Sequence, residues 1–209
     1  RSLNDTANRV LTVCWTSGTT GMPKGVPRSA NMWLAIARAT AEAGNCQKGD
    51  RLLNPFPLVN MAAIGGFLFV SADLGCALIL HHPLDPAIYL SQMQDEKITF
   101  TIAPPMLLNQ LAAQPELWHK FDFSALRAVG SGSAPLSSGM IATFENDYQK
   151  PVINFYGSNE GLAFFATPET VPSCEMRAEY FPRFGVPGLD WPGRCHHAVQ
   201  SKVIDPDTG

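Results

Sequence analysis

The stretch TSGTTGMPKG, from Thr16 to Gly25, combines glycines, hydroxyl side chains and one lysine within ten residues. Glycines allow backbone amides to approach an anion closely, hydroxyls add hydrogen-bond donors, and lysine brings a positive charge. Opposite charges about 4 Å apart attract by roughly 4 kcal/mol near a protein surface, against about 1 kcal/mol in water. The stretch therefore predicts a phosphate-binding loop, in which the lysine matters only if the site is partly desolvated. Its candidate binding residues are Thr16, Ser17, Gly18, Thr19, Thr20, Gly21 and Lys24.

The spacing of this loop differs from two common phosphate-binding motifs. A Walker loop needs G-x-x-x-x-G-K-[ST], but here Gly25 follows the lysine where serine or threonine would stand. The dinucleotide fingerprint G-x-G-x-x-G is also absent. A flexible surface turn without function is the remaining structural alternative.

Two later segments accompany the loop: GSGSAPLS from Gly130 to Ser137, and NFYGSNEG from Asn154 to Gly161. Together, the three segments resemble the motifs of the adenylate-forming superfamily, which includes acyl-CoA synthetases, peptide-synthetase adenylation domains and firefly-type luciferases. Thr16–Gly25 matches the phosphate-loop pattern of that superfamily at every position.

The resemblance implies roles for the later segments. Gly132, Ser133, Ala134 and Pro135 would lie against adenine, and Tyr156 would stack near it. Asn159 stands where the family usually has the threonine that touches the α-phosphate, and its amide is able to donate a hydrogen bond. Glu160 would help to hold Mg²⁺, and Gly157 would border both the nucleotide and the acid. Lys24 and Glu160 are the expected catalytic residues.

NPFPLVNMAAIGG, from Asn54 to Gly66, resembles the family segment that borders the site of the carboxylic acid. Asn60 occupies the position of a common histidine and is a candidate to line that site. The segment contains no acidic residue, whereas amino-acid adenylation domains usually carry an aspartate there for the substrate's ammonium group. We therefore expect an uncharged acyl or aryl acid, with an amino acid as the alternative.

The implied reaction uses ATP and Mg²⁺. A carboxylate attacks the α-phosphorus, pyrophosphate leaves, and the acyl-adenylate passes its acyl group to a thiol, often that of coenzyme A. Two alternatives are a luciferase reaction and a nucleotide-binding module without catalysis. An unrelated phosphotransferase is the weakest alternative. We expect this chain to be part of a longer polypeptide and, when isolated, to adenylate poorly.

The composition excludes some partners. The net charge is −3 and no basic block occurs, so nucleic acid is not an expected partner. No apolar run reaches the roughly 18 residues of a membrane span. Five cysteines without a CxxC pair suit reduced thiols, which favours a cytoplasmic location. The histidine pairs at 81–82 and 196–197 lack further metal ligands at suitable spacing.

Strands alternating with helices must position these residues. Helix start signals and apolar periodicity predict an α/β fold: a mostly parallel sheet with helices on both faces, plus the start of a small β element at the C-terminus. Residues 1–165 would form the nucleotide- and acyl-binding part, and residues 166–209 a loop-rich part. Expected strands cover 10–15, 76–80, 98–103, 127–130, 151–156 and 199–204, and expected helices cover 29–43, 62–74, 85–96, 105–111 and 137–148. The phosphate loop would follow a strand and lead directly into a helix.

Overall fold

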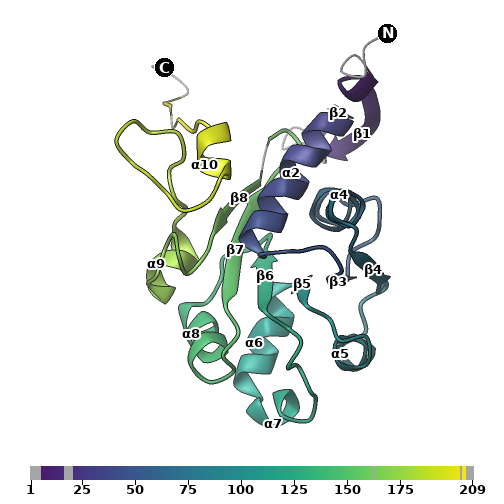
Figure 1. Ribbon diagram of the computed structural model, residues 1–209, viewed down its shortest axis with the longest axis vertical. Coiled ribbons are helices and arrows are strands. Elements are labelled where there is room, and N and C mark those ends of the chain that lie inside the picture. Colours follow the sequence, from purple (N-terminus) through teal and green to yellow (C-terminus); the bar gives the residue numbers. More distant parts are fainter. Residues whose placement is uncertain (1–5, 17–20, 162, 203, 206–209) are drawn as a thin grey trace.

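The computed structural model describes residues 6–16, 21–161, 163–202 and 204–205. A six-stranded sheet with the order β4-β3-β5-β6-β7-β8 forms its centre (Figure 1). Its strands are β3 (Arg51–Asn54), β4 (Ala77–Leu80), β5 (Phe100–Ile102), β6 (Ala128–Gly132), β7 (Val152–Gly157) and β8 (Ala163–Ala166). All neighbouring strands pair in parallel except β7 and β8, which are antiparallel. The α/β fold with a mostly parallel sheet is confirmed.

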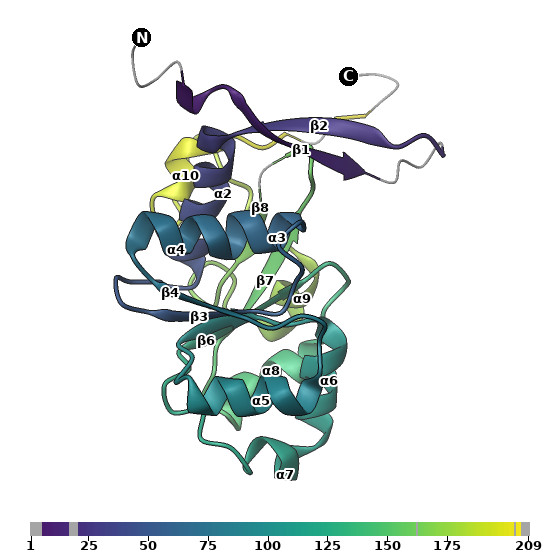
Figure 2. The same cartoon turned by 90° about the vertical axis from the view of Figure 1, so that its right-hand side faces the viewer.

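Helices cover both faces of the sheet (Figure 2). One face carries α2 (Ala30–Ala43), the continuous helical segment α3 (Met61–Ala63), η1 (Ile64–Leu68) and α4 (Phe69–Leu74), and α10 (Cys195–Ala198). The other face carries α5 (Pro86–Asp95), α6 (Pro105–Ala113), α7 (Pro115–Trp118) and α8 (Ser138–Asn146). The short helix α9 (Cys174–Glu179) contacts α8.

Local sequence signals explain where several helices begin and end. The hydroxyls of Ser29 and Ser137 accept hydrogen bonds from backbone amides in the first turns of α2 and α8, and the carboxylate of Asp85 does so for α5. Pro86 occupies the first turn of α5, where no amide donor is needed. Gly75 ends α4 in the left-handed conformation with φ 72°.

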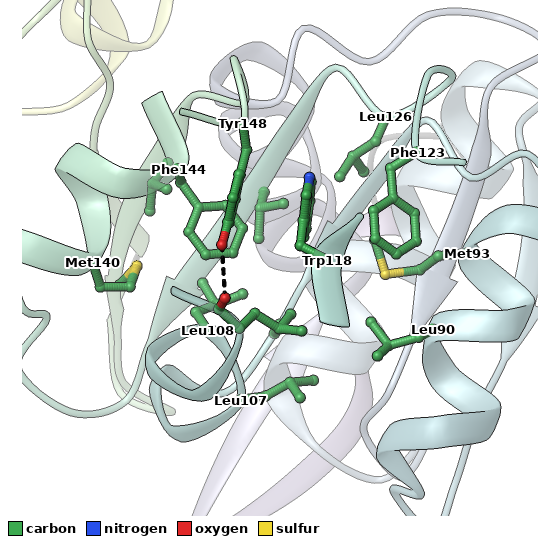
Figure 3. Packing of buried hydrophobic residues seen from close by; sticks show 14 of the residues in the cluster. Leu90, Met93, Leu107, Leu108, Trp118, Phe123, Leu126, Met140, Phe144 and Tyr148 are labelled. Atoms are coloured by element: carbon green, nitrogen blue, oxygen red, sulfur yellow. Dashed lines mark hydrogen bonds between the residues drawn. The ribbon is translucent and has the colours of Figure 1, made fainter. Parts of the chain in front are cut away.

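The sheet separates two hydrophobic clusters. Adjacent Leu52 and Leu53 of β3 belong to different clusters, as the alternation of side chains along a strand requires. The cluster under α5, α6 and α8 centres on Trp118, whose ring stacks on Tyr148 at 4.5 Å and lies 4.4 Å from Phe123 (Figure 3). This dense layer gives the strands a rigid support.

The expectation that the phosphate loop leads directly into a helix is wrong. A second strand, β2 (Lys24–Ser29), follows the loop and pairs antiparallel with β1 (Val10–Thr16) before α2 begins. We call these two strands the hairpin. Pro27 and Arg28 hide β2 in the sequence because neither residue is typical of strands.

Other expectations also need correction. Strand β4 is only partly buried because it lies at the edge of the sheet, and β8, α9 and α10 were not expected. The strand expected over 199–204 is absent from the described residues of that range. The division of the chain at residue 165 stays a prediction.

Candidate active site

A cavity of about 1310 Å³ opens at the carboxyl ends of the parallel strands. Segments that follow β3, β5, β6 and β7 line it, together with the end of β1 and parts of α2 and η1. Ligands of open α/β sheets bind at this end of the strands. The volume exceeds the roughly 300–1,000 Å³ of most small-molecule pockets, which leaves room for two substrates side by side.

The structure brings most of the candidate residues to this cavity. The following line it: Thr16, Asn60, Gly132, Ser133, Ala134, Pro135, Tyr156, Gly157, Asn159 and Glu160. Lys24 and Gly21 do not line it, although Lys24 pairs with Thr16 across the hairpin and is exposed. Ser17, Gly18, Thr19 and Thr20 lie outside the described residues. The cavity therefore unites four segments that are far apart in the sequence: the end of β1, the segment after β3, the turn after β6 and the end of β7 with its following loop.

The segment after β6 turns sharply at the cavity. Gly132 pairs with Phe155 of β7, and a Cβ atom on it would lie 2.1 Å from the carbonyl oxygen of Phe155. Ser133 follows with φ 72°, in the left-handed backbone region that few residues other than glycine, asparagine and aspartate adopt. This turn leaves Ser133, Ala134 and Pro135 exposed at the cavity wall. Their backbone is thus available to a flat ring system.

Aromatic side chains form the adjoining wall. Tyr156 is 56% exposed, and its ring centre lies 6.4 Å from that of Phe164 and 6.1 Å from that of Phe181. These neighbours restrict the ring while leaving part of its surface open. An exposed tyrosine held in this way is suited to stacking on a base.

The loop after β7, residues 158–161, carries polar groups at the cavity mouth. The amide nitrogen Nδ2 of Asn159 lies 3.5 Å from the carbonyl oxygen of Trp15, and its Oδ1 is buried without a hydrogen-bond partner in the part of the chain that the structure describes. Glu160 is exposed. No cluster of three or more His, Cys, Asp or Glu side chains that could hold a metal occurs in the part of the chain that the structure describes. A single carboxylate fits Mg²⁺, which usually takes one or two carboxylates together with substrate phosphates and waters.

Asn60 has a structural task that the sequence motif did not reveal. Its side-chain oxygen accepts a hydrogen bond of 2.7 Å from the amide of Ala62 and caps α3. Asparagine is a favoured residue at this position of a helix. Asn60 therefore helps to orient the helical segment 61–74 as well as lining the cavity.

The inner end of the cavity is built by residues that the sequence motifs did not mark. Ile36 and Thr40 of α2, Gly66 of η1 and Ile102 of β5 line it, and all four are buried. The apolar stripe of α2 was a usable signal for burial, but not for the cavity. The lining as a whole contains two carboxylates, Glu160 and Glu179, and within the described residues no lysine or arginine.

Arg28 was also missed. It stands on β2 and is fully buried, and its Nη2 donates hydrogen bonds to the carbonyl oxygens of Ser158 at 3.0 Å and Gly161 at 2.8 Å. Burial lowers the pKa of its guanidinium group, against the raising effects of Cys14 and Glu160. The only signal in the sequence was a charged residue between the phosphate loop and an apolar helix.

Fold and cavity together define an α/β protein with a cavity at the carboxyl edge of its mostly parallel sheet, beside the hairpin. The family model of the AMP-binding enzymes matches residues 2–209, and the chain belongs to this family. This result confirms the resemblance to adenylate-forming enzymes.

Several curated relatives are CoA ligases. The chain is 32% identical to the 2-succinylbenzoate–CoA ligase of Bacillus licheniformis over 92% of this chain and 36% of the relative. It is 28% identical to the 4-coumarate–CoA ligase-like 2 of Arabidopsis thaliana, over 93% of this chain and 32% of the relative. The chain spans about a third of the length of these relatives.

Solved structures share the fold. The O-succinylbenzoate coenzyme A synthetase of Bacillus subtilis in complex with AMP superimposes with a TM-score of 0.69 at 23% identity, over 79% of this chain and 34% of that chain. The long-chain-fatty-acid-CoA ligase of Archaeoglobus fulgidus gives 0.69 at 20% identity, over 83% of this chain and 36% of that chain.

Proposed function

We propose that the protein is an AMP-forming acid–thiol ligase, which activates a carboxylic acid with ATP and passes the acyl group to a thiol such as coenzyme A. The observation that carries this proposal is the meeting of three motif segments at one cavity: the end of β1, the turn after β6 and the loop after β7. The named CoA ligases among the relatives support the same class of reaction.

Each segment has a part in the proposed mechanism. The exposed ring of Tyr156 and the turn at Gly132–Pro135 would bind adenine. Lys24, with the loop between the two strands of the hairpin, would neutralise the phosphates as pyrophosphate leaves, and Asn159 would donate to the α-phosphate. Glu160 would hold Mg²⁺, which stabilises negative charge on the transferring group when bound. Holding the carboxylate of the acid in line with the α-phosphate lowers the barrier, because the two reactants are already bound in the reactive orientation.

The acid would occupy the inner end of the cavity. Ile36, Gly66 and Ile102 are apolar there, and Thr40 adds one hydroxyl. Glu160 and Glu179 lie instead on the segments that follow β7 and end α9. An apolar acid without a positive charge therefore fits this end better than an amino acid.

The proposal extends to properties of the whole protein. Because the chain spans about a third of its relatives, we expect the isolated 209 residues to catalyse poorly without the remaining segments. In the part of the chain that the structure describes, no helix is long and apolar enough to cross a membrane. A cytoplasmic location stays a prediction.

The test is pyrophosphate release by the full-length protein with a panel of aryl, fatty and amino acids, with and without coenzyme A. We expect release that depends on an uncharged acid, and acyl-CoA formation when the thiol is present. Release with amino acids alone would favour the adenylation-domain alternative. Binding of Mg–ATP without release for any acid would favour a module without catalysis.

Lys24 provides the matching substitution. Lys24→Met should lower kcat/KM for pyrophosphate release by about 100-fold, because a preorganised charge at the phosphates is lost. Lys120→Met is the control, since Lys120 is also exposed but follows α7 on the opposite side of the sheet. Equal activity of the two variants would contradict the role of Lys24.

A further inference from the structure

Arg28 is a buried cation. Its side chain has no exposed surface, and no ion pair to it occurs within the described residues. Nη2 donates hydrogen bonds to two backbone carbonyls, while Nε and Nη1 are buried with no hydrogen-bond partner among the described residues. Burying a charge in this way is costly, so the position needs a reason beyond packing.

The surroundings hold the guanidinium in place. It lies 5.0 Å from the ring centre of Trp33, within the range of a cation–π interaction. The indole nitrogen of Trp33 in turn donates to the hydroxyl of Thr12 on β1 at 3.0 Å. The sulfur of Met61, which lines the cavity, lies 4.0 Å from Nη2. Arg28 is therefore fixed between the hairpin, α2 and the start of α3.

The two carbonyls that Arg28 contacts flank the polar residues of the loop after β7. Ser158 and Gly161 stand on either side of Asn159 and Glu160, so their hydrogen bonds to one nitrogen atom clamp both ends of this short loop. Asn159 makes a further contact between the loop and the hairpin, at the carbonyl of Trp15. The hairpin that carries Lys24 is thus tied to the loop that carries Glu160.

We propose that Arg28 is a positioning residue for Mg–ATP: it clamps the 158–161 loop to the hairpin so that Asn159 and Glu160 face the phosphates and the metal ion. This inference rests on the proposed function for its ligand.

The experiment compares Arg28→Met and Arg28→Lys with wild type in the full-length protein. We expect Arg28→Met to raise the KM for Mg–ATP at least about tenfold, the scale of a lost hydrogen bond from a charged donor, with little change in the KM for the acid. Arg28→Lys keeps the positive charge but replaces the planar guanidinium group with a point charge, so it should recover only part of the lost affinity. Arg38→Met is the control, since Arg38 is exposed and pairs with Asp73 at 3.5 Å on the surface.

A double-mutant cycle separates positioning from general stability. Glu160→Gln should raise the Mg²⁺ concentration needed for half-maximal activity. If Arg28 acts through Glu160, adding Arg28→Met should raise this concentration little further, whereas two independent residues would give additive changes in free energy. Fully additive changes in the double variant, or equal increases in the KM for Mg–ATP and the KM for the acid, would overturn the proposal. If wild type binds Mg–ATP but releases no pyrophosphate, the proposed function fails. The role of Arg28 is then tested by the rise in Tm that Mg–ATP causes. Loss of this rise in Arg28→Met supports the clamp, and an unchanged rise refutes it.

Discussion

Gly132 illustrates how one residue type allows the nucleotide side of the cavity to form. Its backbone lies so close to Phe155 that a methyl group would overlap the carbonyl oxygen at 2.1 Å, a distance that no rotamer change relieves. The close approach of β6 to β7 places the next turn, at Ser133, over the cavity. The glycine is therefore needed for spacing, and the positive φ belongs to Ser133.

Gly132→Ala should separate the ends of β6 and β7. We expect it to lower the free energy of unfolding by about 2–4 kcal/mol, the upper range of overpacking, and to weaken nucleotide binding. Gly139→Ala is the matched control, because its Cβ would meet only the Ser137 hydroxyl at 3.7 Å within α8. Alanine should stabilise that helix by about 0.5–1 kcal/mol. Urea unfolding measures both changes, and equal stabilities of the two variants would contradict the argument.

At the scale of elements, an ion pair joins strands at the end of the sheet opposite the cavity. Asp50 precedes β3 and Arg127 precedes β6, with β5 between these strands. The guanidinium donates to both carboxylate oxygens of Asp50, and its Nη2 also donates to the carbonyl of Asn45. Such a bidentate contact fixes direction as well as distance.

The pair predicts a stability that depends on pH. Burial alone would raise the pKa of Asp50, but hydrogen bonds from Arg127 and from the amide of Gln47 outweigh it and lower the pKa. A carboxylate with a lowered folded pKa stabilises the protein above its unfolded value of about 3.9 and loses this contribution as the pH falls through the folded pKa. Asp50→Asn should therefore cost about 1–3 kcal/mol at neutral pH, with a smaller difference from wild type in strong acid.

Urea unfolding across the acid range checks this expectation. Asp73→Asn serves as the control, because its partner Arg38 is largely exposed and surface pairs contribute about 0–1 kcal/mol. A gap between wild type and Asp50→Asn that stays constant from neutral to strongly acidic pH would show that the ion pair is not its source.

The elements also show what sequence patterns are able to predict. Ser29, Asp85 and Ser137 were sufficient to locate helix starts, since capping is a local interaction. Strand β2 was missed because its pairing with β1, and not its residue types, makes it a strand. Strand β8 is four residues long and extends the sheet only through contact with β7.

At the scale of the whole molecule, the cavity depends on topology. The motif segments were recognisable because each has a distinctive local composition. The inner end was not, since Thr40, Gly66 and Ile102 come from three elements that only the folded sheet brings together. The same holds for Arg28, whose hydrogen-bond acceptors, the carbonyls of Ser158 and Gly161, are more than a hundred residues away in the chain. A sequence pattern does not predict which distant residues come into contact, because these contacts depend on the order of the strands in the sheet.

Gly66 allows the assignment of the inner end to be tested. A Cβ atom there would lie 3.6 Å from Ile102 and 3.8 Å from Thr40, ordinary contact distances, so a methyl group would narrow the cavity without a clash. Gly66→Ala should lower kcat/KM at least about tenfold for the largest accepted acid and leave the smallest unaffected, since one methyl group in an apolar pocket discriminates on this scale.

The neighbouring glycine supplies the contrast. A Cβ atom on Gly65 would lie 2.7 Å from Cγ2 of Ile36, so Gly65→Ala must displace a buried side chain and should lower Tm. Gly66→Ala should keep Tm or raise it, because alanine favours a helical segment over glycine by about 1 kcal/mol. Thermal unfolding and a series of acids of increasing length measure the two effects separately. If Gly66→Ala reduced activity equally for all acids, the acid would have to lie in another part of the cavity, and the apolar inner end would lose its role in selecting the substrate.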